Sequence, residues 1–269
     1  MWLQLVLCYD LLRRCSPLPN ECRVARDNPA ETSCGGAERC TFDAYCFDPL
    51  LLITMPIHTL LFDLDETLYP RSAGVMPLVG QRIRRYISEV YGLSMEEADA
   101  LAQRYYRDYG TSMRGLYLHY GVDTQHFLEF VHQFPLDHMQ PDPALDAMLA
   151  RLPGCKVIFT NASAWHAERV LARLGIRRHF ERIIDVVAFQ YASKPHPQAY
   201  QTCLDLLQVT GSDCLLIEDT ARNIPPATAL GMTTVLVDGD PAAPADYHIA
   251  TILELEPIIH QLDIKACRM

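Results

Sequence analysis

The sequence predicts an α/β fold in which a parallel sheet is covered by helices on both faces. Short apolar runs occur at residues 57–62, 156–159, 183–189, 214–217 and 233–237. A run that is apolar throughout is typical of a strand buried on both faces. Helical patterns separate most of these runs, and strands that alternate with helices form parallel sheets.

Capping and stop signals mark the expected helices. Ser94 and Glu97 form a capping box at the start of one helix, and Gly175 and Gly231 follow the ends of two others. The expected ranges are 78–91, 94–109, 123–132, 143–152, 165–174, 197–207 and 225–230. No convincing strand lies between the first and second apolar runs, so a small all-helical domain is predicted to be inserted after the first strand.

This pattern divides the chain into a core at residues 55–70 and 143–260, a helical insert at 71–142 and an extension at 1–54. Six of the ten cysteines precede residue 50, at Cys8, Cys15, Cys22, Cys34, Cys40 and Cys46. A small disulfide or metal module is one interpretation of the extension, although it contains no CxxC pair. We favour a segment too polar to form a packed core, or a natural start of the protein at Met55.

Composition and charge argue against some classes of partner. The 269 residues are 49% hydrophobic and 21% charged, with a net charge of -10. A nucleic-acid partner is not expected, because there is no basic excess to replace counterions. A membrane partner is not expected either, since no apolar stretch reaches the roughly 20 residues that span a bilayer. With no clear export signal, we expect a cytoplasmic location, and the oligomeric state is left open.

Polar residues follow the expected strands where each strand ends. They are Asp63 and Asp65, Thr160 and Asn161, Lys194, and Glu218 and Asp219. Each alone has an ordinary explanation as a helix cap or a turn residue. In an open parallel sheet, however, ligands bind at the carboxyl ends of the strands. Four regions of the sequence are therefore expected to deliver polar groups to one functional site.

These same residues carry a resemblance to a known family. The segments FDLDETLYP, IFTNA, SKP and IEDTARNI resemble the four motifs of the haloacid dehalogenase-like hydrolases. The chain is most similar to the pyrimidine 5'-nucleotidase branch, in YYRDYGTSMRGL, FTNASAWHAERVLARLGI and EDTARNIPPATALGMTTVLV. The resemblance covers about residues 57–255. It implies a Rossmann-like core and makes the helical insert a small cap domain.

The resemblance implies a role for each catalytic position. Asp63 would be the nucleophile that forms an aspartyl-phosphate, and Asp65 the general acid and base. Alternation along the strand turns these two carboxylates the same way if the extended geometry persists. Thr160 and Asn161 would bind the substrate phosphate, with help from backbone N–H groups at the next helix start. Lys194 would neutralise charge on the nucleophile and on the transferring group.

A magnesium site is expected beside the nucleophile. Asp63, the backbone carbonyl of Asp65, Glu218 and Asp219 offer the hard oxygen ligands that Mg²⁺ prefers. Adjacent carboxylates repel one another without a cation, which supports this interpretation. We expect Asp219 to be the primary ligand, with Glu218 bound directly or through water.

The resemblance implies a magnesium-dependent phosphatase whose partner is a small phosphorylated metabolite, with nucleoside 5'-monophosphates as the first hypothesis. A phosphatase for sugar phosphates or other small metabolites is an alternative, and a phosphomutase is another. A catalytically silent binding protein on the same scaffold is a further alternative, which the complete catalytic set disfavours.

Residues of the helical insert are expected to choose the substrate. Thr111 and Arg114 follow the helix-ending Gly110 and could meet the substrate, although Arg114 could equally be a surface residue. His166 follows the Thr160 loop and could lie near the same edge of the sheet. Three positions depart from the commonest family pattern without removing a charged catalytic residue: Glu66, Ala162 and Thr220.

Overall fold

A computed structural model describes residues 56–262 and 264–267. They contain a six-stranded parallel sheet in the order β3-β2-β1-β4-β5-β6. The strands are β1 (Thr59–Phe62), β2 (Cys155–Phe159), β3 (Arg182–Ile184), β4 (Cys214–Glu218), β5 (Thr233–Val237) and β6 (Tyr247–Ile249). The predicted α/β fold class is confirmed. The interpretations of the extension at 1–54 fall outside the described residues.

Strand β1 lies in the middle of the sheet, between β2 and β4. Its side chains alternate between two core clusters: Leu60 and Phe62 pack on one face of the sheet and Leu61 on the other. A strand with apolar neighbours on both faces is mainly apolar, which explains the consecutive Leu60, Leu61 and Phe62 in the sequence. The register pairs Phe62 with Ile158 of β2 and Ile217 of β4, so the three strands end side by side.

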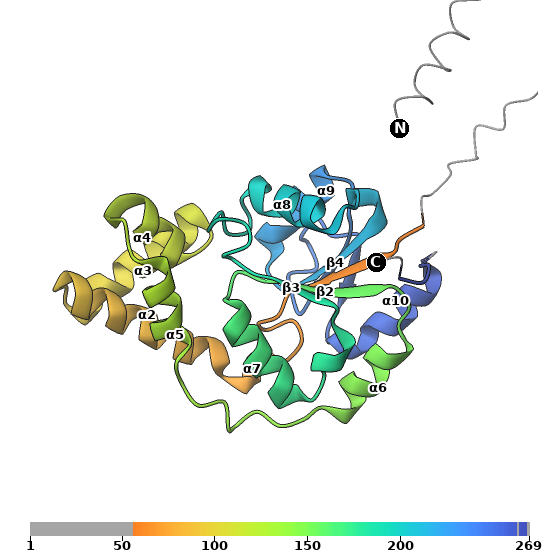
Figure 1. Cartoon of the computed structure of the whole chain (residues 1–269), viewed down its shortest axis with the longest axis horizontal. Coiled ribbons are helices and arrows are strands. Elements are labelled where there is room, and N and C mark those ends of the chain that lie inside the picture. Colours follow the sequence, from red (N-terminus) through yellow and green to blue (C-terminus); the bar gives the residue numbers. More distant parts are fainter. Residues whose placement is uncertain (1–55, 263, 268–269) are drawn as a thin grey trace, which may run out of the picture. The chain divides into compact units, whose positions relative to one another are not determined.

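Helices cover both faces of the sheet, as Figure 1 shows. Helices α6 (Pro143–Arg151), α7 (Ala164–Leu174) and α10 (Leu255–Gln261) pack on the Phe62 face. Helices α8 (Pro197–Leu207) and α9 (Ile224–Ala229) pack on the Leu61 face. Short 3-10 helices occur at Arg71–Ala73, Arg177–His179, Gly211–Asp213, Ala221–Asn223 and Ile252–Glu254.

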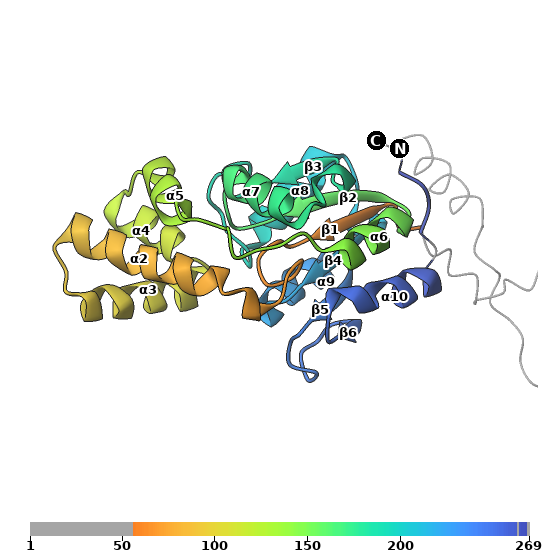
Figure 2. The ribbon, with the colours of Figure 1, turned by 90° about the horizontal axis from the view of Figure 1, so that it is seen from below.

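Four further helices lie between β1 and α6 in the chain: α2 (Val75–Tyr91), α3 (Met95–Tyr109), α4 (Ser112–Tyr120) and α5 (Thr124–His132). They form a bundle beside the sheet in both ribbon views (Figure 2). The capping box at the start of α3 is formed, since Ser94 and Glu97 exchange side-chain and backbone hydrogen bonds. We call this bundle the helical cap.

Three local expectations need correction. Residues 185–189 do not continue β3, because the Asp185 carboxylate accepts hydrogen bonds from the backbone N–H groups of Ala164 and Ala188 and starts a turn. Helix α4 follows Gly110 immediately, capped by the Thr111 side chain, where no helix was expected. Strand β6 and helix α10 were also missed, since both are short.

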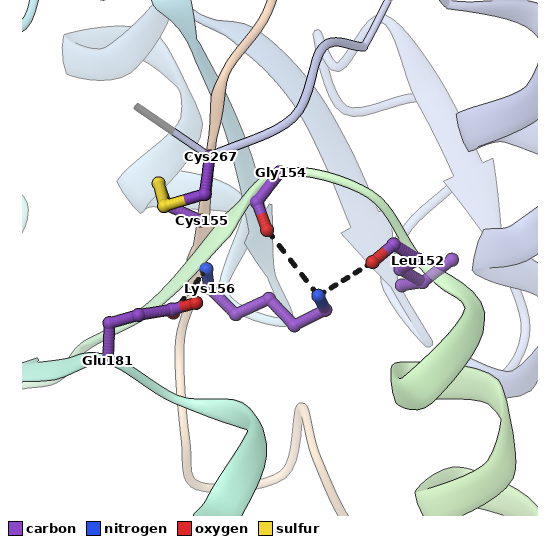
Figure 3. The surroundings of a disulfide bond; sticks show 6 residues. All are labelled: Leu152, Gly154, Cys155, Lys156, Glu181 and Cys267. Carbon is purple, nitrogen blue, oxygen red and sulfur yellow. Dashed lines mark hydrogen bonds between the residues drawn. A yellow bond between two sulfur atoms is a disulfide. The ribbon is translucent and has the colours of Figure 1, made fainter. Parts of the chain in front are cut away.

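A disulfide joins Cys155, at the amino end of β2, to Cys267 near the end of the chain (Figure 3). The last described residues also pair with the chain before β1, through a bridge between Ile57 and Ile264. Disulfides persist mainly in oxidising compartments, so this bond does not support the predicted cytoplasmic location. Within residues 56–262 and 264–267, the helices are too short or too polar to cross a bilayer.

Candidate active site

The chain turns sharply where β1 ends, and this turn brings four polar side chains together. The Asp63 N–H still donates to Ile217 of β4, whereas the Leu68 N–H donates back to Leu64 as in one turn of helix. Residues four apart face each other in such a turn. The Thr67 hydroxyl accordingly lies 3.3 Å from Asp63 Oδ2, and the Tyr69 hydroxyl donates to Asp65 Oδ1 across 2.5 Å.

The turn also sets the backbone of Glu66, which adopts a left-handed conformation with φ of 64°. Gly and Asn enter this region at little cost, whereas a longer side chain such as that of Glu66 is strained there.

Lys194 lies at the centre of the site, buried from solvent. Its ammonium donates to Asp63 Oδ1 and Glu218 Oε2, each across 2.7 Å, and to the Phe159 carbonyl across 2.9 Å. All three of its donors therefore have partners. Burial alone would lower the pKa of Lys194, but the adjacent carboxylates outweigh burial and raise the pKa above its ordinary value.

Asn161 holds the Lys194 loop against the end of β2. Its side-chain amide donates to the Lys194 carbonyl across 3.0 Å and accepts from the Lys194 N–H across 2.7 Å. Thr160, the next residue toward the strand, accepts from the Ala162 N–H. The positions predicted to bind phosphate thus form the rigid frame around the ammonium.

Three carboxylates gather in this space. Asp63, Glu218 and Asp219 each offer one oxygen, and these atoms lie within 4.8 Å of one another. Burial and then the neighbouring Glu218 raise the pKa of Asp63 to about 7, while burial and then Asp63 raise the pKa of Asp219 to about 7. Burial likewise raises the pKa of Glu218. The single positive charge of the Lys194 ammonium does not balance the negative charge of three ionised carboxylates.

The donor set fits a hard divalent cation, because carboxylate oxygens are the ligands that Mg²⁺ binds. Both Glu218 oxygens already have partners, Lys194 and the Thr220 N–H. Asp219 is held by weaker contacts at 3.2 Å to the half-exposed Arg71 and at 3.3 Å to Thr220. Asp63 keeps one oxygen, Oδ2, whose contact with Thr67 is only a long 3.3 Å hydrogen bond. Asp63 and Asp219 are therefore the side chains best placed to hold such a cation.

Asp65 lies beside this cluster with different neighbours. His166 Nε2 lies 2.9 Å from Asp65 Oδ1, the oxygen that also accepts from Tyr69. Burial acts to raise the pKa of Asp65, but His166 and Tyr69 outweigh it and hold the pKa below its ordinary value. The two aspartates of the first motif thus differ: the pKa of Asp63 is raised and the pKa of Asp65 is lowered.

One cavity of about 210 Å³ collects these groups. Eight of the sequence-predicted site residues line it: Asp63, Asp65, Thr111, Thr160, Asn161, Lys194, Glu218 and Asp219. The helical cap supplies a mostly apolar wall, which comprises Met76, Val79, Ile83, Met113, Phe127, Leu128 and Val131. The cavity therefore has a charged floor and a mainly apolar roof, which also carries the polar side chains of Tyr106, Ser112 and His132.

The two predicted cap residues have different places. The Thr111 hydroxyl lies 2.9 Å from the Ser193 hydroxyl, so it joins the cap to the Lys194 loop. Arg114 is not among the lining residues, and its guanidinium donates to the Tyr191 carbonyl. Gly110 contacts the same loop so closely that a Cβ atom would lie 2.4 Å from the Lys194 carbonyl oxygen.

A comparison with protein families agrees with this geometry. The model of the haloacid dehalogenase-like hydrolases matches residues 57–231, from the first strand to the end of the fourth motif region. The chain belongs to the haloacid dehalogenase-like hydrolases. The pyrimidine 5'-nucleotidase branch is not singled out by the match.

Individual relatives of this hydrolase have less than 30% sequence identity to it in the two comparisons that follow. Phosphate metabolism protein 8 of Saccharomyces cerevisiae is 29% identical over 194 residues, which cover 65% of this chain and 60% of the yeast protein. The glyceraldehyde 3-phosphate phosphatase of Methanocaldococcus jannaschii is 25% identical and matched over 77% of this chain and 98% of its own length. This hydrolase thus spans less than two thirds of the yeast relative.

The fold also matches a solved structure of the family. The crystal structure of an HAD phosphatase from Thermococcus onnurineus superposes with a TM-score of 0.53 at 22% identity. The match covers 76% of this chain and 98% of the other. At this level of identity the likeness establishes the shared fold.

Sequence reasoning on this hydrolase missed several residues of the site. Thr67 and Tyr69 each lie four residues after an aspartate of the first motif, and this spacing would have found them if a helical turn had been assumed. His132 and Arg222 line the cavity from α5 and from the loop after β4. No local pattern in the sequence indicated these two.

Proposed function

We propose that the protein is a magnesium-dependent phosphomonoester hydrolase that acts through an aspartyl-phosphate, with nucleoside 5'-monophosphates as substrates. The observation that carries this proposal is the floor of the cavity. There, Lys194 donates to Asp63 across 2.7 Å, and a second carboxylate, Asp65, lines the same cavity with partners of its own, Tyr69 and His166. A nucleophile beside a separate proton-transfer group is what two-step phosphoryl transfer requires.

In the first step, an Asp63 carboxylate oxygen bonds to phosphorus as the bond from phosphorus to the ester oxygen breaks. Asp65 must enter this step protonated, against the effect of His166 and Tyr69 in the substrate-free fold, and it gives that proton to the departing alcohol oxygen. In the second step, Asp65 takes a proton from water, whose oxygen attacks phosphorus and releases inorganic phosphate and the Asp63 carboxylate. Both steps use the same pair of aspartates, so each group ends as it began.

The surrounding residues bind and orient the phosphate. Lys194 offers the positive charge next to Asp63, and Glu218, with both oxygens engaged, fixes the position of that ammonium. Thr160 and the backbone after β2 would contact phosphoryl oxygens. Asp63 and Asp219 would hold Mg²⁺, which when bound neutralises charge on the transferring phosphoryl group.

The apolar roof of the cavity favours a nucleoside over a sugar as the leaving group. Met113, Phe127 and Leu128 offer ring and aliphatic contacts but no hydrogen-bonding side-chain groups. A flat nucleobase can use such contacts, whereas each hydroxyl of a sugar buried there would lose its water. The size of the cavity suits a small ester rather than a macromolecule.

A phosphatase for sugar or triose phosphates is the second candidate. The relative from Methanocaldococcus jannaschii, named for glyceraldehyde 3-phosphate, supports it. A phosphomutase would share the aspartate pair and differ in whether water reaches the aspartyl-phosphate. The cytoplasmic location stays a prediction.

The test is phosphate release from a panel of nucleoside monophosphates and sugar phosphates, with Mg²⁺ and with a chelator. We expect turnover that requires Mg²⁺ and is fastest with a nucleotide. Asp63→Asn should lower turnover by about 10⁴-fold or more while the melting curve stays cooperative. Asp205→Asn, on the exposed surface of α8, is the matched control. Near-normal turnover in Asp63→Asn would remove the nucleophile assignment.

A further inference from the structure

The Asp65 carboxylate is held by one of its two oxygens. Tyr69 donates to Oδ1 across 2.5 Å, and His166 Nε2 lies 2.9 Å from the same atom. Among residues 56–262 and 264–267, no hydrogen bond reaches Oδ2. The carboxylate lines the cavity, so the oxygen without a protein partner is the one available to a substrate.

His166 has no exposed surface, and its second nitrogen has no partner. It lies in the first turn of α7, where its ring stacks on that of His132 with centroids 4.4 Å apart. Its Nδ1 finds no hydrogen-bond partner within the described part of the chain. The tautomer with hydrogen on Nε2 therefore fits best, because it donates to Asp65 and leaves only a lone pair unpaired.

Packing alone does not account for an imidazole at this position. An apolar side chain would fill the space without burying an unpaired nitrogen, which costs free energy. The hydrogen bond to Asp65 is the contact that an apolar side chain could not replace.

We propose that His166 is a positioning residue for proton transfer: with Tyr69 it clamps Asp65 Oδ1, so that Oδ2 is presented to the leaving oxygen. This inference rests on the proposed function, because it assigns a role relative to Asp65 as acid and base. His166 does not touch the reacting atoms and acts through Asp65.

A positioning role predicts a dependence on the leaving group. An alkyl alcohol is a poor leaving group and needs the proton of Asp65 when Asp63 attacks, whereas p-nitrophenolate departs with little help. Hydrolysis of the aspartyl-phosphate needs Asp65 as a base for both kinds of ester. Loss of the clamp should therefore slow the first step for alkyl esters only, and the second step for every ester.

The experiment compares His166→Leu, which removes the donor, with His166→Gln, whose amide nitrogen can reach the position of Nε2. Tyr69→Phe removes the other donor and little else, so it tests the clamp even if His166→Leu fails to fold. Tyr86→Phe, another buried tyrosine, whose hydroxyl hydrogen-bonds with His126 in the helical cap, is the matched control. The substrates are uridine 5'-monophosphate, β-glycerophosphate and p-nitrophenyl phosphate, followed by rapid quench and at steady state.

For His166→Leu we expect kcat on the alkyl esters to fall by about 10²-fold, within the range of general acid–base effects. With p-nitrophenyl phosphate we expect a burst of nearly one product per site at close to the wild-type rate, followed by slow turnover. His166→Gln should recover most of the lost kcat, and Tyr69→Phe should reproduce the burst pattern with a smaller loss.

An equal slowing of the burst and of alkyl turnover would overturn the proposal, because a general disturbance of the site would act on both. It would also be overturned if His166→Gln behaved like His166→Leu, or if Tyr69→Phe matched wild type. These results differ from failure of the proposed function, in which wild-type protein releases no phosphate from any of the three esters.

Discussion

Strand β2 has a buried lysine at each of its ends, and the two lysines have opposite surroundings. At the carboxyl end, the Lys194 ammonium meets the Phe159 carbonyl and two carboxylates, Asp63 and Glu218. At the amino end, the Lys156 ammonium donates to two neutral carbonyls, those of Leu152 and Gly154 (Figure 3). Burial lowers the pKa of Lys156, whereas carboxylates raise that of Lys194.

The comparison shows what makes a buried charge functional in this fold. Burial disfavours both ammonium groups. At the catalytic end it is offset by carboxylates that the ends of β1 and β4 deliver, while the amino end of β2 meets no comparable group. Glu181, an acid at that end, accepts a hydrogen bond from the Lys156 backbone N–H. The charged cavity therefore lies at the carboxyl ends of the strands.

The largest contrast is expected from replacing each lysine by methionine. Lys194→Met removes the charge beside the nucleophile, and kcat should fall by about 10²–10³-fold, as for other electrostatic groups at transition states. Phosphate release under saturating Mg²⁺ measures this. Lys156→Met serves as the matched control. Similar losses of activity in the two variants would contradict the functional difference between the two ends of β2.

The catalytic end should also bind Mg²⁺ with a strong dependence on pH. The pKa values of Asp63 and Asp219 are about 7 in the metal-free fold, raised from 3.8. A raised acid pKa stabilises the metal-free fold at low pH, and this contribution is lost as pH rises through 7. Mg²⁺ needs both groups ionised, so its affinity should fall by about 10-fold per pH unit for each displaced proton below pH 7.

Calorimetric titration of Mg²⁺ in two buffers with different ionisation enthalpies counts the protons released. Proton release should be clear at pH 6 and small at pH 8.5. An affinity that stays constant from pH 5.5 to 8.5 would mean that these carboxylates do not hold the ion. The corresponding titration of Asp219→Asn should show weaker binding and fewer released protons.

The disulfide at the opposite end should matter for stability and not for catalysis. Cys267→Ser should lower the free energy of unfolding by about 2–4 kcal/mol without reductant, the usual size for a lost disulfide. Its kcat should match wild type, because Cys155 lies at the amino end of β2. Denaturant unfolding with and without reductant measures the difference. If wild type and variant unfold together in both conditions, the bond does not form in solution.

The smallest effect is expected for the stability of Lys156→Met at neutral pH. Because burial lowers the pKa of Lys156, the unfolded chain binds this proton more tightly than the fold does. The free energy of unfolding of wild type should therefore increase relative to that of Lys156→Met as pH rises from 7 toward the ordinary lysine pKa of 10.5. Melting temperatures of the two proteins at pH 7 and 9.5 test the sign. A gap that moves the other way would show that the ammonium is stabilised at this end too.

Much of the core was predictable because it depends on local pattern. The strand cores, the alternation with helices and the capping box at Ser94 follow from apolar periodicity and backbone capping, which act over a few residues. The meeting of Asp63, Thr160, Lys194 and Asp219 in one cavity was also predictable, because parallel strands that alternate with helices must end at a common edge. The turn after Ile184 was not, because it depends on how Asp185 meets the start of α7.

The sequence by itself determined which residue types stand at the strand ends, and hence that Asp63, Thr160, Lys194 and Asp219 would share an edge. Only the tertiary structure decided that Lys194, from the loop before α8, meets carboxylates at the carboxyl end of β2, while Lys156 of β2 donates to backbone carbonyls at the amino end. It also decided that α7 brings His166 to Asp65. The physical reason is that hydrogen bonds and pKa values depend on distances between groups that are far apart in the chain. Asp65 and His166, for example, are separated by 101 residues. Local sequence patterns do not determine such distances.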